Sequence, residues 1–195
     1  MKYPEIARIG DKTYHINTDF RVAIKCFQVS EDASIGGYER FLAIIYLLFG
    51  DEGLKDSENY NKLMEIAQKY LSCGKERVEN TEEPDMDYIQ DEDLIRSSFE
   101  YDYKYDPYEE KHVHWWKYFN DLNNLSNSEM GNCCALNRVR AIRNINLNDI
   151  KDQKERNKIQ KAKKYYSLKK ERKQREFTEE EIRNMEEFDR LMEGG

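Results

Sequence analysis

The fold class is decided by FLAIIYLLF, residues 41–49, the longest uninterrupted apolar run of the chain. The run is nine residues long, whereas a helix that crosses a bilayer needs about 20. Glycines at positions 50 and 53 follow it and predict the end of a helix. We therefore predict a helix over 38–49 that is buried on most sides of a folded core, and no membrane span.

The residues before this run predict a β-hairpin and a first helix. Residues 5–17 read EIARIGDKTYHIN, where apolar side chains alternate on both sides of Gly10-Asp11 and predict a hairpin. Thr18 or Asp19 can cap the helix that follows, whose apolar residues recur at helical spacing at positions 20, 23, 24 and 27. Two strands alone are marginal in water, so the hairpin has to pack on helices.

A third helix completes the N-terminal part. Ser57 can cap it, its apolar side begins at Tyr60, and Gly74 is placed to end it. We expect residues 1–74 to form a hairpin plus three-helix subdomain, close to the smallest size that supports an independent core.

The second half of the chain alternates between acidic and aromatic segments. Residues 75–92 are acidic, contain a proline and lack a sustained period, so we expect an acidic linker there. Residues 93–148 are expected to form an aromatic-rich helical subdomain. Its main helix is predicted to bury one face and to point two aromatic side chains toward a partner. The buried face consists of Trp115, Phe119 and Leu122, and the two outward residues are Trp116 and Tyr118.

The C-terminal residues 149–195 are expected to form a charged helical tail. Residues 151–175 consist mostly of Lys, Arg, Glu and Gln, which are good helix formers. A capping-box pattern at 178–181 then precedes apolar side chains at near-helical spacing, which we predict to bind a partner or the core. These are Ile182, Met185, Phe188 and Met192. A frayed, solvated helix is the alternative. The predicted fold is mainly α, with a small N-terminal β-hairpin packed on a helical core and an extended charged C-terminal helical tail.

The net charge of −7 conceals strong segregation along the chain. Residues 1–49 are neutral, residues 50–110 carry −12, residues 111–175 carry +11 and residues 176–195 carry −6. Blocks of like charge usually mark solvated faces or interaction tails, and neighbouring opposite blocks can neutralise each other within one chain or between chains. Self-association therefore stays open. Nucleic-acid binding through residues 151–175 is the weaker alternative, because the sequence pI is about 5.2.

Known catalytic and metal motifs are absent from the sequence. It contains no GxSxG, HExxH, P-loop or GxGxxG pattern, so we predict a protein that is not an enzyme and binds no cofactor. His112 and His114 are two residues apart and lack a well-spaced third ligand, which argues against a metal site. The four cysteines include no CxxC pair and are predicted to be reduced thiols. The N-terminus has no apolar region typical of a signal peptide.

The order of several segments resembles the bacteriophage gene-product-fifteen family of tailed phages and prophages of Gram-positive bacteria. The most distinctive pieces are TDFR at 18–21 and HWWK at 114–117, with ERFLAIIYLLFG at 39–50, DEDLIRSSF at 91–99 and KKYYSLKK at 163–170 around them. The resemblance covers roughly residues 3–170. The charged extension 171–195 is longer than the family pattern, and Cys133-Cys134 lies where that pattern has a short linking region.

This resemblance implies a role in tail morphogenesis. Members look like tail assembly chaperones that bind the tape measure protein, keep it soluble and help to recruit major tail tube protein subunits. It also implies a location in the host bacterial cytoplasm and absence from the mature virion. A structural virion component of the tail or connector is the alternative that the sequence leaves open.

Overall fold

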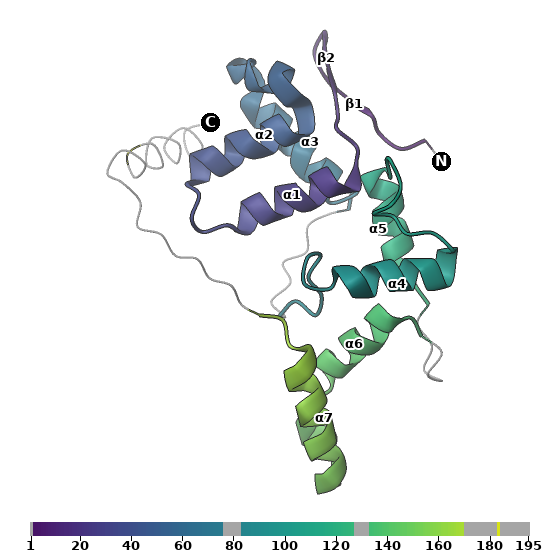
Figure 1. The fold of residues 1–195 in the computed structure, drawn as a ribbon. Helices are drawn as coiled ribbons and strands as arrows, with labels where there is room; N and C mark the ends of the chain where they lie inside the picture. The colour runs from purple at the N-terminus through teal and green to yellow at the C-terminus, as the bar shows by residue number, and fades with distance from the viewer. Residues whose placement is uncertain (1, 76–82, 127–132, 170–182, 184–195) are drawn as a thin grey trace. The chain divides into compact units, whose positions relative to one another are not determined.

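The computed structural model describes residues 2–75, 83–126, 133–169 and 183. Within these residues seven α-helices follow one two-stranded hairpin, which confirms the predicted mainly α fold with a small N-terminal β-hairpin (Figure 1). The chain divides into two compact units. The first draws on Met1–Val78 and His112–Trp116, and the second on Glu79–Lys111 and Lys117–Lys170.

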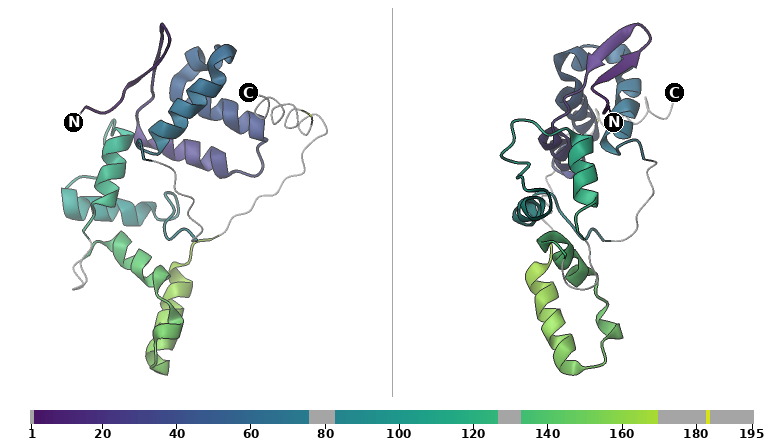
Figure 2. Two further views of the ribbon diagram at one scale, coloured as in Figure 1. Left: turned by 180° about the vertical axis from the view of Figure 1, so that it is seen from behind. Right: turned by 90° about the vertical axis from the view of Figure 1, so that its right-hand side faces the viewer.

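The hairpin of the first unit pairs β1 (Ile6–Ile9) with β2 (Lys12–His15) in antiparallel register (Figure 2). Gly10 adopts φ 58° at the turn, a left-handed conformation that a two-residue hairpin loop requires and that glycine adopts without strain. Ala7 and Tyr14 lie opposite each other in this register and are both buried. The alternation seen in the sequence therefore places one face of the hairpin against the helices.

Three helices form the rest of this unit: α1 (Phe20–Glu31), α2 (Gly37–Leu54) and α3 (Tyr60–Leu71). The Asp19 carboxylate accepts a hydrogen bond from the Arg21 amide at 2.9 Å, so Asp19 is the N-cap of α1. Helix α2 packs on both α1 and α3. The buried residues of the three helices are Phe20, Ala23, Ile24, Cys26, Phe41, Ile45, Leu48, Phe49, Leu63, Met64, Ala67 and Tyr70.

Helix α2 is broken at Gly50, where φ is 64° and ψ is −156°. Only glycine adopts such a conformation readily, so the predicted end of the helix at this position is a sharp kink followed by one further turn. The carbonyl of Leu48, just before the kink, accepts a hydrogen bond from the Asn17 amide at 2.8 Å. No helix in the described ranges combines the length and the apolar character that a membrane crossing requires.

A polar cluster joins the hairpin to the connection between α2 and α3. The Asp56 carboxylate accepts hydrogen bonds from Lys12 Nζ at 2.8 Å, from the Tyr14 hydroxyl, and from Asn59 Nδ2 at 3.0 Å. The bond from Lys12 contributes most to lowering the pKa of Asp56 to about 2, and the bonds from Tyr14 and Asn59 lower it further. The ionised carboxylate is therefore stabilised in the folded state.

We expect this cluster to make part of the stability of the first unit acid-sensitive. The ordinary pKa of an aspartate in an unfolded chain is about 3.9, so the contribution of Asp56 is fully present above that pH. It is lost as pH falls toward the folded value of about 2. Urea unfolding of wild type and Asp56→Asn, followed from pH 6 to pH 2, checks this. The wild type should be the more stable at pH 6, and the gap should close as pH falls. A gap that is the same at all pH values would contradict the assignment.

The second unit contains α4 (Glu92–Tyr103), most of α5 (Trp115–Asn123), α6 (Ala135–Asn144), a short 3-10 turn η2 (Leu147–Asp149) and α7 (Gln153–Tyr166). Helix α6 packs on both α4 and α7. Ser98 of α4 is buried, and its Oγ accepts the Leu136 amide at 3.0 Å, which satisfies one of the open donors at the start of α6. The apolar core includes Ile95, Phe99, Tyr118, Leu122, Leu125, Cys134, Leu136 and Val139.

Arginines of α6 bind the acidic segment that precedes α4. Arg143 donates to both carboxylate oxygens of Asp91, at 2.6 and 2.7 Å, and to the carbonyl of Asp85 at 2.8 Å. Arg140 Nε donates to the Asp85 carboxylate at 3.1 Å. From Asp85 onward, the segment 75–92 that we expected as a linker therefore takes part in the packing of the second unit.

The predicted aromatic helix begins later than its pattern indicated. Helix α5 starts at Trp115, and Val113 and His114 are extended instead of helical. Its buried positions are Trp115, Tyr118 and Leu122, whereas Phe119 is half-buried. The prediction that Trp115, Phe119 and Leu122 form the buried face is therefore confirmed for Trp115 and Leu122 and wrong for Phe119, because Tyr118 is the residue that the packing buries between them.

Candidate partner-binding surfaces

The segment that opens α5 is bound tightly within the first unit. Phe20 N donates to the Val113 carbonyl at 2.9 Å, and Trp115 N donates to the Thr18 carbonyl at 2.7 Å. An isolated β-bridge pairs Asp19 with His114. These bonds explain why the residues before Trp115 are extended, since their backbone groups are paired with the start of α1 instead of a helical turn.

His114 has both ring nitrogens occupied. Its Nδ1 accepts the Trp116 amide at 3.0 Å, so its Nε2 carries the proton and donates to the Pro4 carbonyl at 3.1 Å. Burial lowers the pKa of His114, although the bond to Pro4 opposes this shift. His112 Nε2 lies 2.9 Å from Thr18 Oγ1. Within the described ranges, no group of three or more His, Cys, Asp or Glu side chains is arranged to hold a metal ion.

The two tryptophans differ in burial. Trp115 is fully buried and donates through Nε1 to the Leu71 carbonyl at 3.0 Å. Trp116 is half-buried, and its Nε1 donates to the Tyr70 carbonyl at 2.9 Å. A Cβ atom added at Gly74 would lie 3.3 Å from the Trp116 ring. Part of the Trp116 ring thus faces solvent from a fixed position, and its role in partner binding stays a prediction.

Tyr118 does not lie on a surface. It is fully buried in the second unit and stacks on Phe99, with ring centroids 5.3 Å apart and an angle of 19° between the rings. The structure therefore corrects the expectation that this side chain meets a partner. The other four predicted partner-binding residues, Ile182, Met185, Phe188 and Met192, lie outside the described residues and stay predictions.

Two of the four cysteines are thiols whose pKa is raised by burial. All four are free, and burial raises the pKa of both Cys26 and Cys73 to about 12. These two thiols are therefore protonated near neutral pH, which makes them poor nucleophiles and poor metal ligands.

An apolar surface that the sequence pattern did not indicate lies on α2. Tyr46 is 51% exposed, and Leu42, Ala43 and Leu47 around it are half-buried. Residues 41–50 contain no charged side chain. The apolar run suggested burial on most sides. Phe41, Ile45, Leu48 and Phe49 are buried where α1, α3 and β2 pack on α2, whereas Tyr46 is exposed. We call Leu42, Ala43, Tyr46 and Leu47 the α2 outer face. Contiguous apolar surface without charge is a common feature of protein-binding sites.

Comparison with known proteins identifies the family of this chain. A search of curated proteins and a search of solved structures find no match for this chain. A family model described as "Bacteriophage Gp15 protein" matches residues 2–168. The match spans both compact units and includes TDFR at 18–21 and HWWK at 114–117, the two pieces that meet in the bridge between Asp19 and His114. The chain therefore belongs to the Bacteriophage Gp15 protein family.

Proposed function

We propose that this protein is a tail assembly chaperone, which binds the phage tape measure protein and keeps it soluble while the tail is built. The observation that carries the proposal is membership of a bacteriophage family over residues 2–168. In this role the protein acts without catalysis, in the host bacterial cytoplasm, and does not remain in the mature virion. It also helps to recruit the major tail tube protein.

The physical requirement for such a chaperone is an accessible apolar surface on a soluble body. A tape measure protein is a long helix with an apolar stripe, which aggregates if it stays exposed to water. The α2 outer face supports the proposal, because an apolar helix can lay its stripe against Leu42, Tyr46 and Leu47. Segregated surface charge on the rest of the chain would keep the complex soluble. Several weak contacts along one client would add up through avidity.

Co-expression with tape measure fragments tests the proposal. The tagged full-length protein should recover soluble fragments that precipitate when they are expressed alone. Tyr46→Lys should reduce the recovery strongly, because a charge in the middle of the α2 outer face would be desolvated when the client binds. Tyr101→Lys is the matched control, since Tyr101 is also an exposed helical tyrosine, at 61%, and lies on α4.

Two results would contradict the proposal. The first is a folded wild-type protein that recovers no fragment of the tape measure protein. The second is detection of the protein in purified virions, by mass spectrometry, at a stoichiometric level. That second result would identify a structural component of the tail or connector instead.

A further inference from the structure

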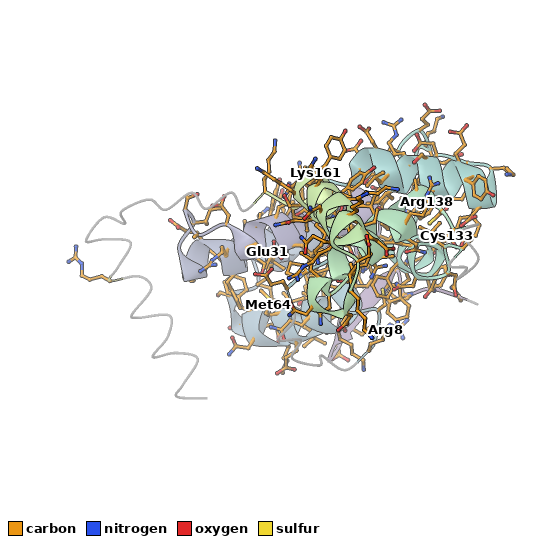
Figure 3. All side chains as sticks on the ribbon, turned by 90° about the horizontal axis from the view of Figure 1, so that it is seen from below. Arg8, Glu31, Met64, Cys133, Arg138 and Lys161 are labelled. Carbon is orange, nitrogen blue, oxygen red and sulfur yellow. The ribbon has the colours of Figure 1, made fainter. Side chains whose placement is uncertain are left out.

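Helix α7 presents a row of lysines on one exposed strip. Lys154, Lys158, Lys161 and Tyr165 fall at positions i, i+4, i+7 and i+11, so they share one face of the helix. All four side chains are exposed, and Tyr165, at 81%, is the most exposed of the large hydrophobic residues that the structure describes. Figure 3 shows the side chains of α7, with Lys161 labelled. We call these four residues the α7 strip.

The opposite side of α7 anchors the helix to the second unit. Ile159, Ala162 and Tyr166 are half-buried on the side where α7 packs on α6. The Tyr166 carbonyl accepts Arg143 Nε at 2.7 Å, and Lys163 Nζ donates to the Ile145 carbonyl at 2.5 Å. The strip is therefore displayed by a helix that is fixed at its C-terminal end.

The lysines of the strip are available to a ligand. Among the described residues, no ion pair includes Lys154, Lys158 or Lys161. The Asp152 carboxylate caps the start of α7 by accepting the Glu155 amide at 2.7 Å. Within the described ranges, the strip thus combines three lysines that form no ion pair with one exposed aromatic ring. That ring meets the Tyr166 ring edge-on, with centroids 4.9 Å apart.

The composition of the strip indicates which class of partner it fits. A protein helix would need apolar burial to bind, but Ile159, Ala162 and Tyr166 of α7 are half-buried on the α6 side and only Tyr165 is exposed. Exposed salt bridges alone contribute only about 0–1 kcal/mol each. A nucleic-acid strand gains from counterion release at each neutralised phosphate, and its bases stack on aromatic rings. We propose that the α7 strip binds a single-stranded nucleic acid, with the three lysines on successive phosphates and Tyr165 stacked on a base.

The expected binding site is short, and its affinity is sensitive to salt. From Lys154 to Tyr165 the strip spans twelve residues, which separates its ends by about 16 Å along the helix. The net charge of −7 opposes an approaching polyanion, but screening limits that repulsion to about 8 Å at physiological ionic strength. This activity is independent of the proposed chaperone function, because it uses a different helix in the other unit.

Fluorescence anisotropy of the full-length protein with a labelled oligo-dT of about 15 nucleotides tests the proposal. The wild type should bind, with log K falling against log salt at a slope of about −2 for three phosphates of a single strand. A triple variant with Lys154→Gln, Lys158→Gln and Lys161→Gln should bind at least about tenfold more weakly at 0.1 M salt and lose most of that slope. Tyr165→Ala should weaken binding by about 5- to 100-fold on oligo-dT but not on an abasic oligonucleotide.

The matched control is a second triple variant, Lys25→Gln, Lys62→Gln and Lys69→Gln. It makes the same change in net charge at three exposed helical lysines of the first unit, and it should bind as the wild type does. The proposal is overturned if the wild type fails to bind at about 50 mM salt, or if both triple variants lose affinity equally. It is also overturned if poly-glutamate of equal charge displaces the oligonucleotide as well as unlabelled oligo-dT does, because the strip would then be a surface for acidic polypeptides.

Discussion

Replacing Trp115 by alanine is expected to lower the free energy of unfolding by about 3–5 kcal/mol. The side chain is fully buried, its ring meets Phe27 edge-on at 5.6 Å between centroids, and its Nε1 donates to the Leu71 carbonyl at 3.0 Å. The substitution would open a cavity beside Phe27 of α1 and the end of α3, and would also remove that hydrogen bond. Urea unfolding of the purified full-length variant, followed by circular dichroism at 222 nm, measures the loss.

Trp116 offers a matched control for this experiment. It is the neighbouring residue and also donates to a carbonyl at the end of α3, that of Tyr70, but it is only half-buried. Trp116→Ala should therefore lower the free energy of unfolding by less than half as much as Trp115→Ala, because it removes less buried apolar surface. Equal losses for the two variants would contradict the description of Trp115 as the main anchor of the segment 112–116.

Replacing Arg143 by methionine is expected to lower the free energy of unfolding by about 3–5 kcal/mol, because the Asp91 carboxylate would stay buried without its counter-charge. The side chains of Arg143 and Asp91 are only 11% and 3% exposed, and they form two hydrogen bonds of 2.6 and 2.7 Å. The same guanidinium also donates to the carbonyls of Asp85 and Tyr166. One side chain therefore connects α6 to the segment before α4 and to the end of α7.

A double-mutant cycle separates the pair from the other bonds of Arg143. Asp91→Asn combined with Arg143→Met should cost less than the sum of the two single losses, because the second change no longer strands a charge. Arg138→Met is the control on the same helix: Arg138 is exposed, and its replacement should change stability by no more than about 0.5 kcal/mol. A single loss for Arg143→Met that matches this control would show that the buried pair does not stabilise the fold.

Much of the local structure follows from patterns within a few residues. The hairpin follows from alternation around a glycine turn, since that arrangement suits a strand with one buried face. Asp19 caps α1 as predicted, because a short carboxylate side chain can reach the free amide two residues on. The α2 helix and its break at Gly50 follow from an apolar run that ends in glycine. These features depend on short-range sterics and hydrogen bonding, which the sequence alone specifies.

The sequence predicted the candidate surfaces less well than the local structure, because the exposure of a side chain depends on the elements that pack against its helix. Tyr46 lies in the middle of an apolar run, and its exposure becomes evident only once α1 and α3 are placed on one side of α2. Tyr118 and Phe119 are adjacent aromatic residues in the same helix, so periodicity could not decide which one is buried. A rotation of about 100° per residue separates them, and the packing around α5 selects Tyr118.

By itself, the sequence determined the mainly helical class, the hairpin, the cap of α1, the segregated charge and the family resemblance that the match over residues 2–168 confirms. Tertiary structure decided where α5 begins, which tryptophan is the anchor, and that the acidic residues 85 and 91 bind α6 arginines. It also decided that Lys154, Lys158 and Lys161 of α7 remain exposed. The physical reason is the separation along the sequence of the residues that interact. Caps, turns and periodicity act between residues a few positions apart, whereas these outcomes depend on pairs more than 40 positions apart, such as Trp115 with Leu71 and Arg143 with Asp91.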